Sequence, residues 1–274
     1  MTGDVGVQLK GAGEVGGGCH IFGGCGFPAP GLQDFNWKPF FTIGSFGFTK
    51  PMLLAILAAA VVIGFFWLAF RAPKLVPRGM QNLGEMAILA VRDQILRPSL
   101  GRKGDSYLPL LVSLFFFIYI MNVMELIPVF QFPVPSRIGF VWPMVFVVYF
   151  LYLFLGFKHQ GFLGYFKSMI PPGVPWPIYI ILVPVELLRF FVFQPFTLGV
   201  RLFGNMFAGH LLLTIFTVAT WYLLSLSVGL LYAAGSFFLA IFVFLLEILV
   251  TLLQAFIFTT LTATYIASST EPVH

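Results

Sequence analysis

The most restrictive feature of the sequence is its last long apolar stretch, residues 228–268. Glu247 is its one charged residue, and Gly235-Ser236 is its one weak helix breaker. A helix of roughly 40 residues is about 60 Å long, whereas the hydrocarbon of a bilayer is about 30 Å thick. Such a helix has to break or to tilt far beyond the usual average of about 20°, and we expect the strong tilt.

The rest of the chain is also too apolar for a soluble domain. Hydrophobic residues make up 59% of the sequence and charged residues 9%, compared with about 25% charged residues in soluble proteins. We therefore predict an all-α membrane protein with about five membrane passages. The formal net charge of +5 fits the cytoplasmic excess of Lys and Arg in membrane proteins, so we expect no nucleic-acid partner.

Residues 1–50 are rich in glycine, proline and aromatic residues and contain no long apolar run. We interpret them as an irregular extracytoplasmic tail. Its cysteines, Cys19 and Cys25, are expected to form a disulfide or to stay as free thiols. With His20 they offer fewer than the four ligands of a structural zinc site, so no metal is expected, and no cofactor is expected either.

Residues 51–175 are predicted to form a part with three spans: Met52–Phe70, Leu108–Met124 and Ile138–Phe157. Between the first two spans, apolar residues recur at helical spacing and predict an amphipathic helix near 79–97 on the membrane surface. The apolar positions are Met80, Leu83, Ala87, Ile88, Val91 and Ile95. A connecting helix in solution is the alternative, which this apolar stripe disfavours.

Residues 176–268 predict a strongly tilted hairpin of two long helices, followed by a short cytoplasmic tail at 269–274. The first helix contains Pro184 and Pro195, which we expect to bend it. Lys and Arg are more frequent in the segments 71–106 and 158–175 than on the opposite side, which predicts the N-terminus outside and the C-terminus inside. The sequence lacks a presequence rich in Arg and Ser, which favours a bacterial plasma membrane over the mitochondrial inner membrane.

Arg201 is the most unusual charge in the chain, because Glu186 and Glu247 are its nearest acidic residues in sequence. An arginine at membrane depth costs about 2.5–3.5 kcal/mol on insertion scales. Helical spacing places Thr197, Arg201, Asn205 and Ala208 on one stripe, and the nearby small residues predict a shallow polar groove that is open to a partner. The small residues are Gly199, Gly204, Ala208 and Gly209. Either Arg201 is a structural cation or it is an electrostatic element of an ion path, and we favour the ion path.

The second helix of the hairpin carries a polar face of its own. Glu247, Thr251 and Gln254 share this face at helical spacing. If the helices pair about a turn near residue 227, His210 meets Glu247, and Arg201 lies at the depth of Gln254. A histidine and a carboxylate inside a membrane are candidates for a proton relay, and a structural ion pair is the alternative.

Three motifs resemble subunit a of the F-type ATP synthases. The segment Arg-Leu-Phe-Gly-Asn-Met-Phe-Ala-Gly at 201–209 lies within 195–210, which looks like that family's signature helix. The segment 247–258 resembles its last helix, and Asn122-Val-Met-Glu125-Leu-Ile-Pro128 resembles its earlier turn. The motifs follow the family's order and spread over about half of the chain. The first is highly specific, and the other two support it.

The resemblance implies a role for each matching residue. Arg201 matches the family's essential arginine, and His210 and Glu247 match its complementary pair of a histidine and an acid. Other matches are the polar residues of the outer half-channel (Asn205, Gln254 and Asn122), a hydroxyl residue before the arginine (Thr197), an acid at the end of a span (Glu125) and an acid near the inner half-channel (Glu186). The spacing from Glu186 to Arg201 differs by one residue from the commonest pattern.

The implied function is that of a stator subunit, which passes protons through two offset half-channels to and from the carboxyl groups of a rotating c-ring. Implied partners are the c-ring, b-type peripheral stalk subunits, the F1 catalytic head indirectly, and the lipid membrane. The chain has no P-loop, so it is not expected to make ATP by itself. A secondary ion transporter and a non-transporting membrane scaffold are the rival functions; the first is disfavoured by the lack of two related halves.

Overall fold

The computed structural model describes residues 41–43, 46–161, 164–165, 176–223 and 229–270. The predicted tails at 1–40 and 271–274, with Cys19 and Cys25, lie outside these residues. The chain divides into two compact units, one of Lys50–Ala208 with Glu247–His274 and one of Met1–Thr49 with Gly209–Leu246. Each unit is described by itself.

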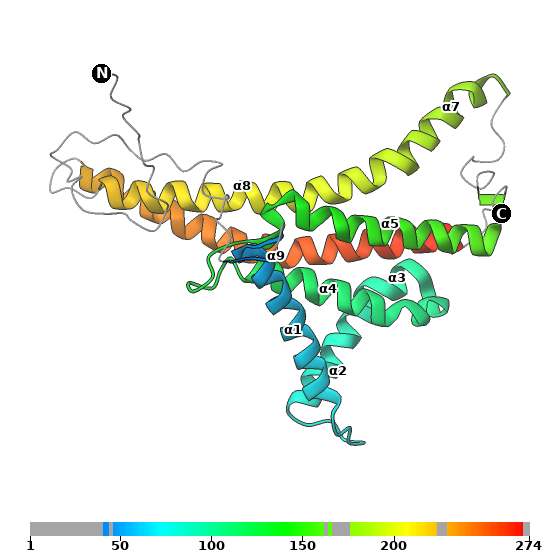
Figure 1. Cartoon of the computed structure of the whole chain (residues 1–274), viewed down its shortest axis with the longest axis horizontal. Helices are drawn as coiled ribbons and strands as arrows, with labels where there is room; N and C mark the ends of the chain where they lie inside the picture. The colour runs from blue at the N-terminus through cyan, green and yellow to red at the C-terminus, as the bar shows by residue number, and fades with distance from the viewer. Residues whose placement is uncertain (1–40, 44–45, 162–163, 166–175, 224–228, 271–274) are drawn as a thin grey trace. The chain divides into compact units, whose positions relative to one another are not determined.

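The larger unit begins with α1 (Lys50–Phe70), followed by α2 (Met80–Val91), a π-turn (Arg92–Leu96), α3 (Arg97–Leu100), a 3₁₀ segment (Gly101–Tyr107) and α4 (Leu108–Val123) (Figure 1). A short 3₁₀ turn (Val134–Ser136) leads to α5 (Ile138–Gln160), and α7 (Trp176–Leu188) with a second π-turn (Arg189–Phe193) leads to α8 (Gln194–Leu223). The last helix is α9 (Gly229–Thr270). A hairpin of two short strands, β1 (Phe41–Ile43) and β2 (Phe46–Phe48), precedes α1.

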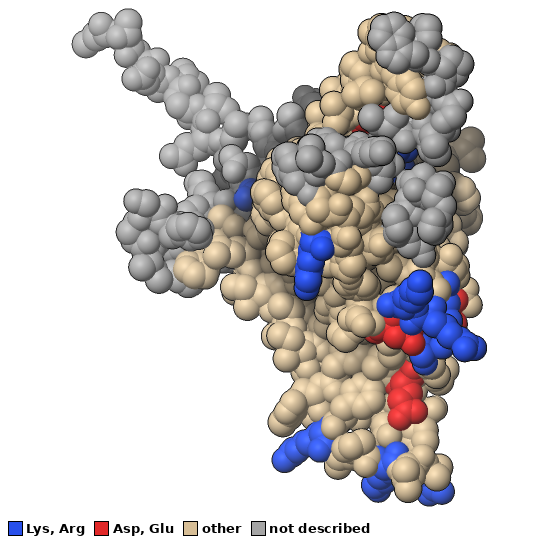
Figure 2. Space-filling model, turned by 90° about the vertical axis from the view of Figure 1, so that its right-hand side faces the viewer, with Lys and Arg blue, Asp and Glu red and all other residues tan. Residues whose placement is uncertain are grey.

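Five helical segments are long and apolar enough to cross a membrane, which confirms the predicted all-α membrane fold. They are Lys50–Phe70, Met80–Val123, Ile138–Gln160, Ile178–Leu223 and Gly229–Thr270. Gly235-Ser236 does not interrupt α9, which runs for 42 residues. At 1.5 Å per residue α9 is about 60 Å long, as the sequence predicts. Figure 2 shows a mostly uncharged surface on one face, with the charged side chains gathered in a few places.

The segment predicted to be amphipathic, 79–97, is helical, and its place on the membrane surface stays a prediction. Val91 and Ile95 are buried, whereas Met80 and Leu83 are exposed. The packed face of α2 instead contains Gly84, where an added Cβ would lie 2.9 Å from the Cβ of Ala69 in α1. The π-turn explains the change of face, because a π-turn takes more residues than an α-turn and so rotates one half of the segment against the other.

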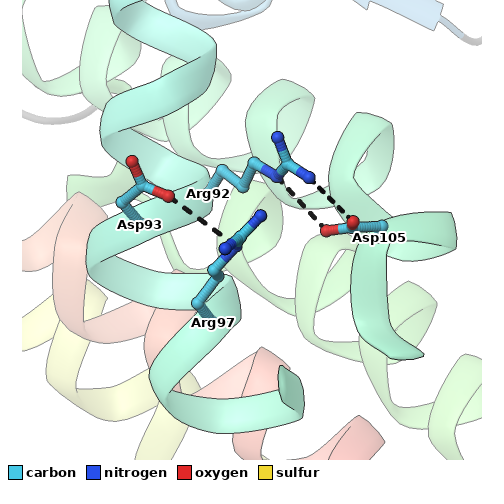
Figure 3. A network of polar contacts seen from close by, with 4 residues as sticks. All are labelled: Arg92, Asp93, Arg97 and Asp105. Atoms are coloured by element: carbon cyan, nitrogen blue, oxygen red, sulfur yellow. Dashed lines mark hydrogen bonds and ion pairs between the residues drawn. The ribbon is translucent and has the colours of Figure 1, made fainter. Parts of the chain in front are cut away.

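Ion pairs hold the segment between α2 and α4 in place. Arg92 donates two hydrogen bonds to Asp105, from Nε to Oδ1 at 3.3 Å and from Nη2 to Oδ2 at 2.8 Å (Figure 3). Arg97 Nε lies 3.8 Å from Asp93 Oδ1 on the same turn. The bidentate pair joins the π-turn to the 3₁₀ segment and fixes the reversal of the chain before α4.

The core of the larger unit lies where α9 meets α4, α5 and the segment after α2. Its buried residues are Val91, Ile95, Leu96, Leu100, Leu111, Val112, Leu155, Ala263 and Ile266. Gly199 of α8 packs on α5, because an added Cβ would lie 3.3 Å from Val145 Cγ2. Gly199 therefore faces α5, and the expectation that it borders an open groove beside Arg201 is wrong.

In the smaller unit, the second part of α8 and the first part of α9 contact each other. The hydroxyl of Ser236 donates a hydrogen bond to the carbonyl of Phe216 at 2.9 Å. Many large apolar side chains of this unit are exposed, among them Leu231 and Phe238. An exposed apolar surface of this extent suits contact with lipid.

Candidate functional site

Arg201 lies on the exposed side of α8. Thr197, Arg201, Asn205 and Ala208 are all exposed, whereas Leu198, Leu202 and Met206 are buried on the other side of the helix. We call these exposed residues the arginine face. An added Cβ at Gly204 would meet nothing within 4 Å, so the surface beside Arg201 is low at this point. Arg201 forms no ion pair among the described residues.

A second group of polar residues is buried on α9. Glu247, Thr251 and Gln254 have exposures of only 2%, 1% and 4%. They recur at intervals of three and four residues, so they share one stripe of the helix. We call them the buried row. The sequence predicts their common face, and the structure places that face inside the larger unit.

Two further polar residues, at the end of α4, are buried as well. Asn122 is fully buried, and Glu125, in the turn after α4, is 4% exposed. Glu247 of the buried row interacts electrostatically with Glu125. The structure therefore brings together carboxylates that the sequence places on different spans.

Several atoms in this buried region have hydrogen-bonding capacity that the described residues do not use. They are Nδ2 and Oδ1 of Asn122, Oε2 of Glu247 and Oγ1 of Thr251. A polar group that is buried without a hydrogen bond costs about 1–3 kcal/mol. In protein interiors such atoms are satisfied by ordered water or ions, or they serve a functional role.

Glu186 is held by a neighbour on its own helix. Its Oε2 accepts a hydrogen bond from Arg189 Nε at 2.7 Å. Sequence analysis did not single out Arg189, although an acid and a base three residues apart on a helix are a recognisable signal. Tyr265 was also missed; it is buried on α9 and interacts electrostatically with both Arg201 and Arg189.

The remaining predicted residues differ in their setting. The hydroxyl of Thr197 donates to the carbonyls of Phe193 at 2.7 Å and Gln194 at 3.2 Å, so it is hydrogen-bonded within its own helical segment.

His210 is partly buried and belongs to the smaller unit. Its pairing with Glu247 would join the two units and stays a prediction. Among the described residues there is no cluster of His, Cys, Asp and Glu that could hold a metal ion.

Comparison with known proteins identifies the family of this chain. The family model described as ATP synthase A chain matches residues 52–267. The chain belongs to the ATP synthase A chain family. It is 44% identical over 262 residues to ATP synthase subunit a of Streptomyces lividans, covering 93% of this chain and 92% of the relative.

Two other relatives carry the same name. Subunit a of Frankia alni is 40% identical over 250 residues, which cover 89% of this chain and 86% of the relative. Subunit a of Rhodococcus erythropolis is 39% identical over 246 residues, which cover 88% of this chain and 89% of the relative. The similarity to these relatives therefore extends over most of the chain, and the family match runs from the start of α1 to near the end of α9.

Proposed function

We propose that this chain is the stationary, proton-conducting subunit of an ATP synthase Fo motor. It passes protons through two offset half-channels to and from the carboxyl groups of a c-ring, and so couples proton flow to rotation and ATP synthesis. The observation that carries the proposal is the arginine face, where a cation without an ion pair among the described residues stands exposed on an apolar helix.

The chemistry of Arg201 follows from its charge. A rotor carboxyl group that faces lipid has to be protonated, because an unpaired charge there is expensive. Opposite Arg201 the charged form of the carboxyl group is favoured, so the rotor acid releases its proton at this point. The fixed positive charge also blocks a direct proton leak between the two half-channels.

The entry path follows the buried region at α4 and α9. Asn122 and Glu247 are buried with unused hydrogen-bonding atoms, which ordered water satisfies in protein interiors. A chain of water along Asn122, Glu125, Glu247 and Gln254 would carry protons to the rotor. His210 completes this path as the partner of Glu247, since histidine gains and loses a proton near neutral pH.

The exit path lies at the other end of the arginine face. Glu186 is 19% exposed and sits before α8, where it can take protons that leave the rotor. Thr197 and Asn205 lie on the arginine face beside Arg201 and line the surface that the rotor passes. The exit side is cytoplasmic if the N-terminus is outside, as the distribution of Lys and Arg predicts.

Membership of the family and the proposed path together suggest the partners. These are the c-ring, b-type peripheral stalk subunits and, indirectly, the F1 catalytic head, in a bacterial plasma membrane. Each proton that crosses 100 mV contributes about 2.3 kcal/mol to rotation. Protons are the coupling ion in this proposal, because a sodium site would need oxygen ligands that belong mostly to the rotor.

The test is substitution of the exposed cation in the assembled ATP synthase in membrane vesicles. We expect Arg201→Ala to lower proton-driven ATP synthesis by at least about 100-fold, because it removes a preorganised charge at the reacting group. Arg78→Ala is the matched control, since Arg78 is exposed in the loop between α1 and α2. Normal synthesis by an assembled Arg201→Ala complex would refute the proposed function.

A further inference from the structure

The ion pair of Glu186 and Arg189 lies immediately before the arginine face. Arg189 Nε and Glu186 Oε2 are 2.7 Å apart, and the two side chains are 57% and 19% exposed. Arg189 is also the first residue of the π-turn Arg189–Phe193 that joins α7 to α8. The ion pair and the π-turn together set the position of the Glu186 carboxylate relative to Arg201.

The π-turn changes the face on which Arg189 lies. Arg189 precedes Arg201 by twelve positions, and at about 100° per residue an unbroken α-helix would separate them by about 120° around the axis. A π-turn takes about one residue more than an α-turn, which shifts the register by about 100° and leaves a separation of about 20°. By the same reasoning Glu186 comes within about 40° of Arg201.

The exposure of the side chains agrees with this common face. Arg189 and Arg201 are exposed and Glu186 is partly exposed, whereas Phe190 and Leu202 are buried. Glu186, Arg189 and Arg201 therefore follow one side of the helical segment.

The π-turn is fixed by its neighbours. The hydroxyl of Tyr152 in α5 donates a hydrogen bond to the Phe190 carbonyl at 3.3 Å, and Thr197 donates to the Phe193 carbonyl at 2.7 Å. The buried ring of Phe190 packs edge to face against Tyr152 and Tyr165. The rotation that aligns Arg189 with Arg201 is thus built into the packing of the larger unit.

We propose that Arg189 is a positioning residue for proton exit. It holds the Glu186 carboxylate on the side of Arg201 through the hydrogen bond from Arg189 Nε to Glu186 Oε2. Glu186 takes a proton from a rotor acid through water and returns it to water on the exit side; only O–H bonds form and break. The inference rests on the proposed function.

The groups that face this pair are few among the described residues. From α9 the pair is approached by Tyr265, and from α5 by Tyr152, which bonds the adjacent backbone; Tyr165 packs on Phe190. None of these tyrosines carries a fixed charge near neutral pH. Among the described residues, Arg189 is therefore the charged group that contacts Glu186.

The experiment measures ATP-driven proton pumping by the complex together with the amount of assembled complex. For Arg189→Gln we expect pumping per assembled complex to fall by about tenfold, because the carboxylate has lost the charged donor that holds it in place. Arg189→Lys keeps a charged donor and should restore most of the pumping. In a Glu186→Gln background, Arg189→Gln should add less than a twofold change, because Arg189 acts through Glu186.

Several outcomes would overturn the inference. If pumping in Arg189→Gln fell only in proportion to the amount of assembled complex, Arg189 would have a structural role only, and unchanged pumping would show no role. Equal effects of Arg189→Gln with and without Glu186 would mean that Arg189 acts elsewhere. Arg78→Gln controls for loss of an exposed arginine. If only the Arg189 variants lack their expected effects, the proposed function is not refuted, because Arg201→Ala tests that function separately.

Discussion

The arginine face on α8 and the buried row on α9 place polar residues in opposite settings. Arg201, Thr197 and Asn205 are exposed on a helix whose other side is packed, whereas Glu247 and Gln254 are almost fully buried. Both groups are costly in a membrane, but the cost arises differently. The exposed cation needs a counter-charge, and the buried groups need hydrogen-bond partners.

The difference indicates where each group finds its partner. Arg201 forms no ion pair within the described part of the chain, and its exposure suits a counter-charge that another subunit supplies. The unused atoms of Asn122 and Glu247 are enclosed by this chain itself, which suits small occupants such as water and protons. In the proposed function, the arginine face is thus the surface for a partner, and the buried row is the path for a proton.

Among the variants that distinguish the buried row from the arginine face, the largest loss of ATP synthesis is expected for the predicted relay pair, His210 and Glu247. His210→Glu and Glu247→His should each lower ATP synthesis by on the order of 100-fold, because each leaves two like groups together. The double variant restores one acid and one histidine and should recover at least about tenfold over either single change. Proton-driven ATP synthesis and assembly are measured for all three variants.

A double variant no better than the single ones would disprove the pairing. In that case Glu247 would act with Glu125, with which it interacts within the larger unit, and His210 would belong to another part of the path. This result would restrict the proton path at the buried row to residues of the larger unit.

Much of this arrangement follows from sequence periodicity. The spans, the uninterrupted α9, and the common faces of Arg201 with Asn205 and of Glu247 with Gln254 depend on residues three or four apart on one helix, which the sequence displays directly. The exposure of the arginine face was also expected, because small residues and an arginine without a local acid predict an open surface.

The parts that the sequence did not predict depend on other interactions. The π-turns at Arg92–Leu96 and Arg189–Phe193 change helix faces without a distinct residue pattern. The packing of Gly199 on Val145, and the electrostatic interaction of Tyr265 with two arginines, join distant segments. Such contacts are set by packing of the whole unit and not by local spacing.

A smaller effect is expected from Asn122, the fully buried amide near the buried row. Asn122→Leu replaces its unused donor and acceptor by an apolar group of similar size, so the folded complex should be as stable as before or more stable. Proton conduction should fall about tenfold, because water loses a polar partner on the entry path. Passive proton flux through Fo and thermal stability are the two measurements.

The matched control is Asn82→Leu, since Asn82 is exposed on α2. If Asn122→Leu destabilised the complex and left the proton flux unchanged, Asn122 would be a structural residue and the buried region would not be a path. If both variants lowered the flux equally, the effect would come from the loss of any asparagine.

The smallest effect is expected on the arginine face itself, at Thr197. Its hydroxyl already donates to the carbonyls of Phe193 and Gln194, so it contributes to the helix and the π-turn more than to the exposed surface. Thr197→Val should lower ATP synthesis by about twofold, in keeping with about 1 kcal/mol or less for one hydrogen bond within a helix. Thr197→Ser keeps the hydroxyl and should match the native rate. A loss in Thr197→Val as large as that in Arg201→Ala would mean that the hydroxyl takes part in proton transfer, and that exposed hydroxyl groups, and not the cation alone, define the arginine face.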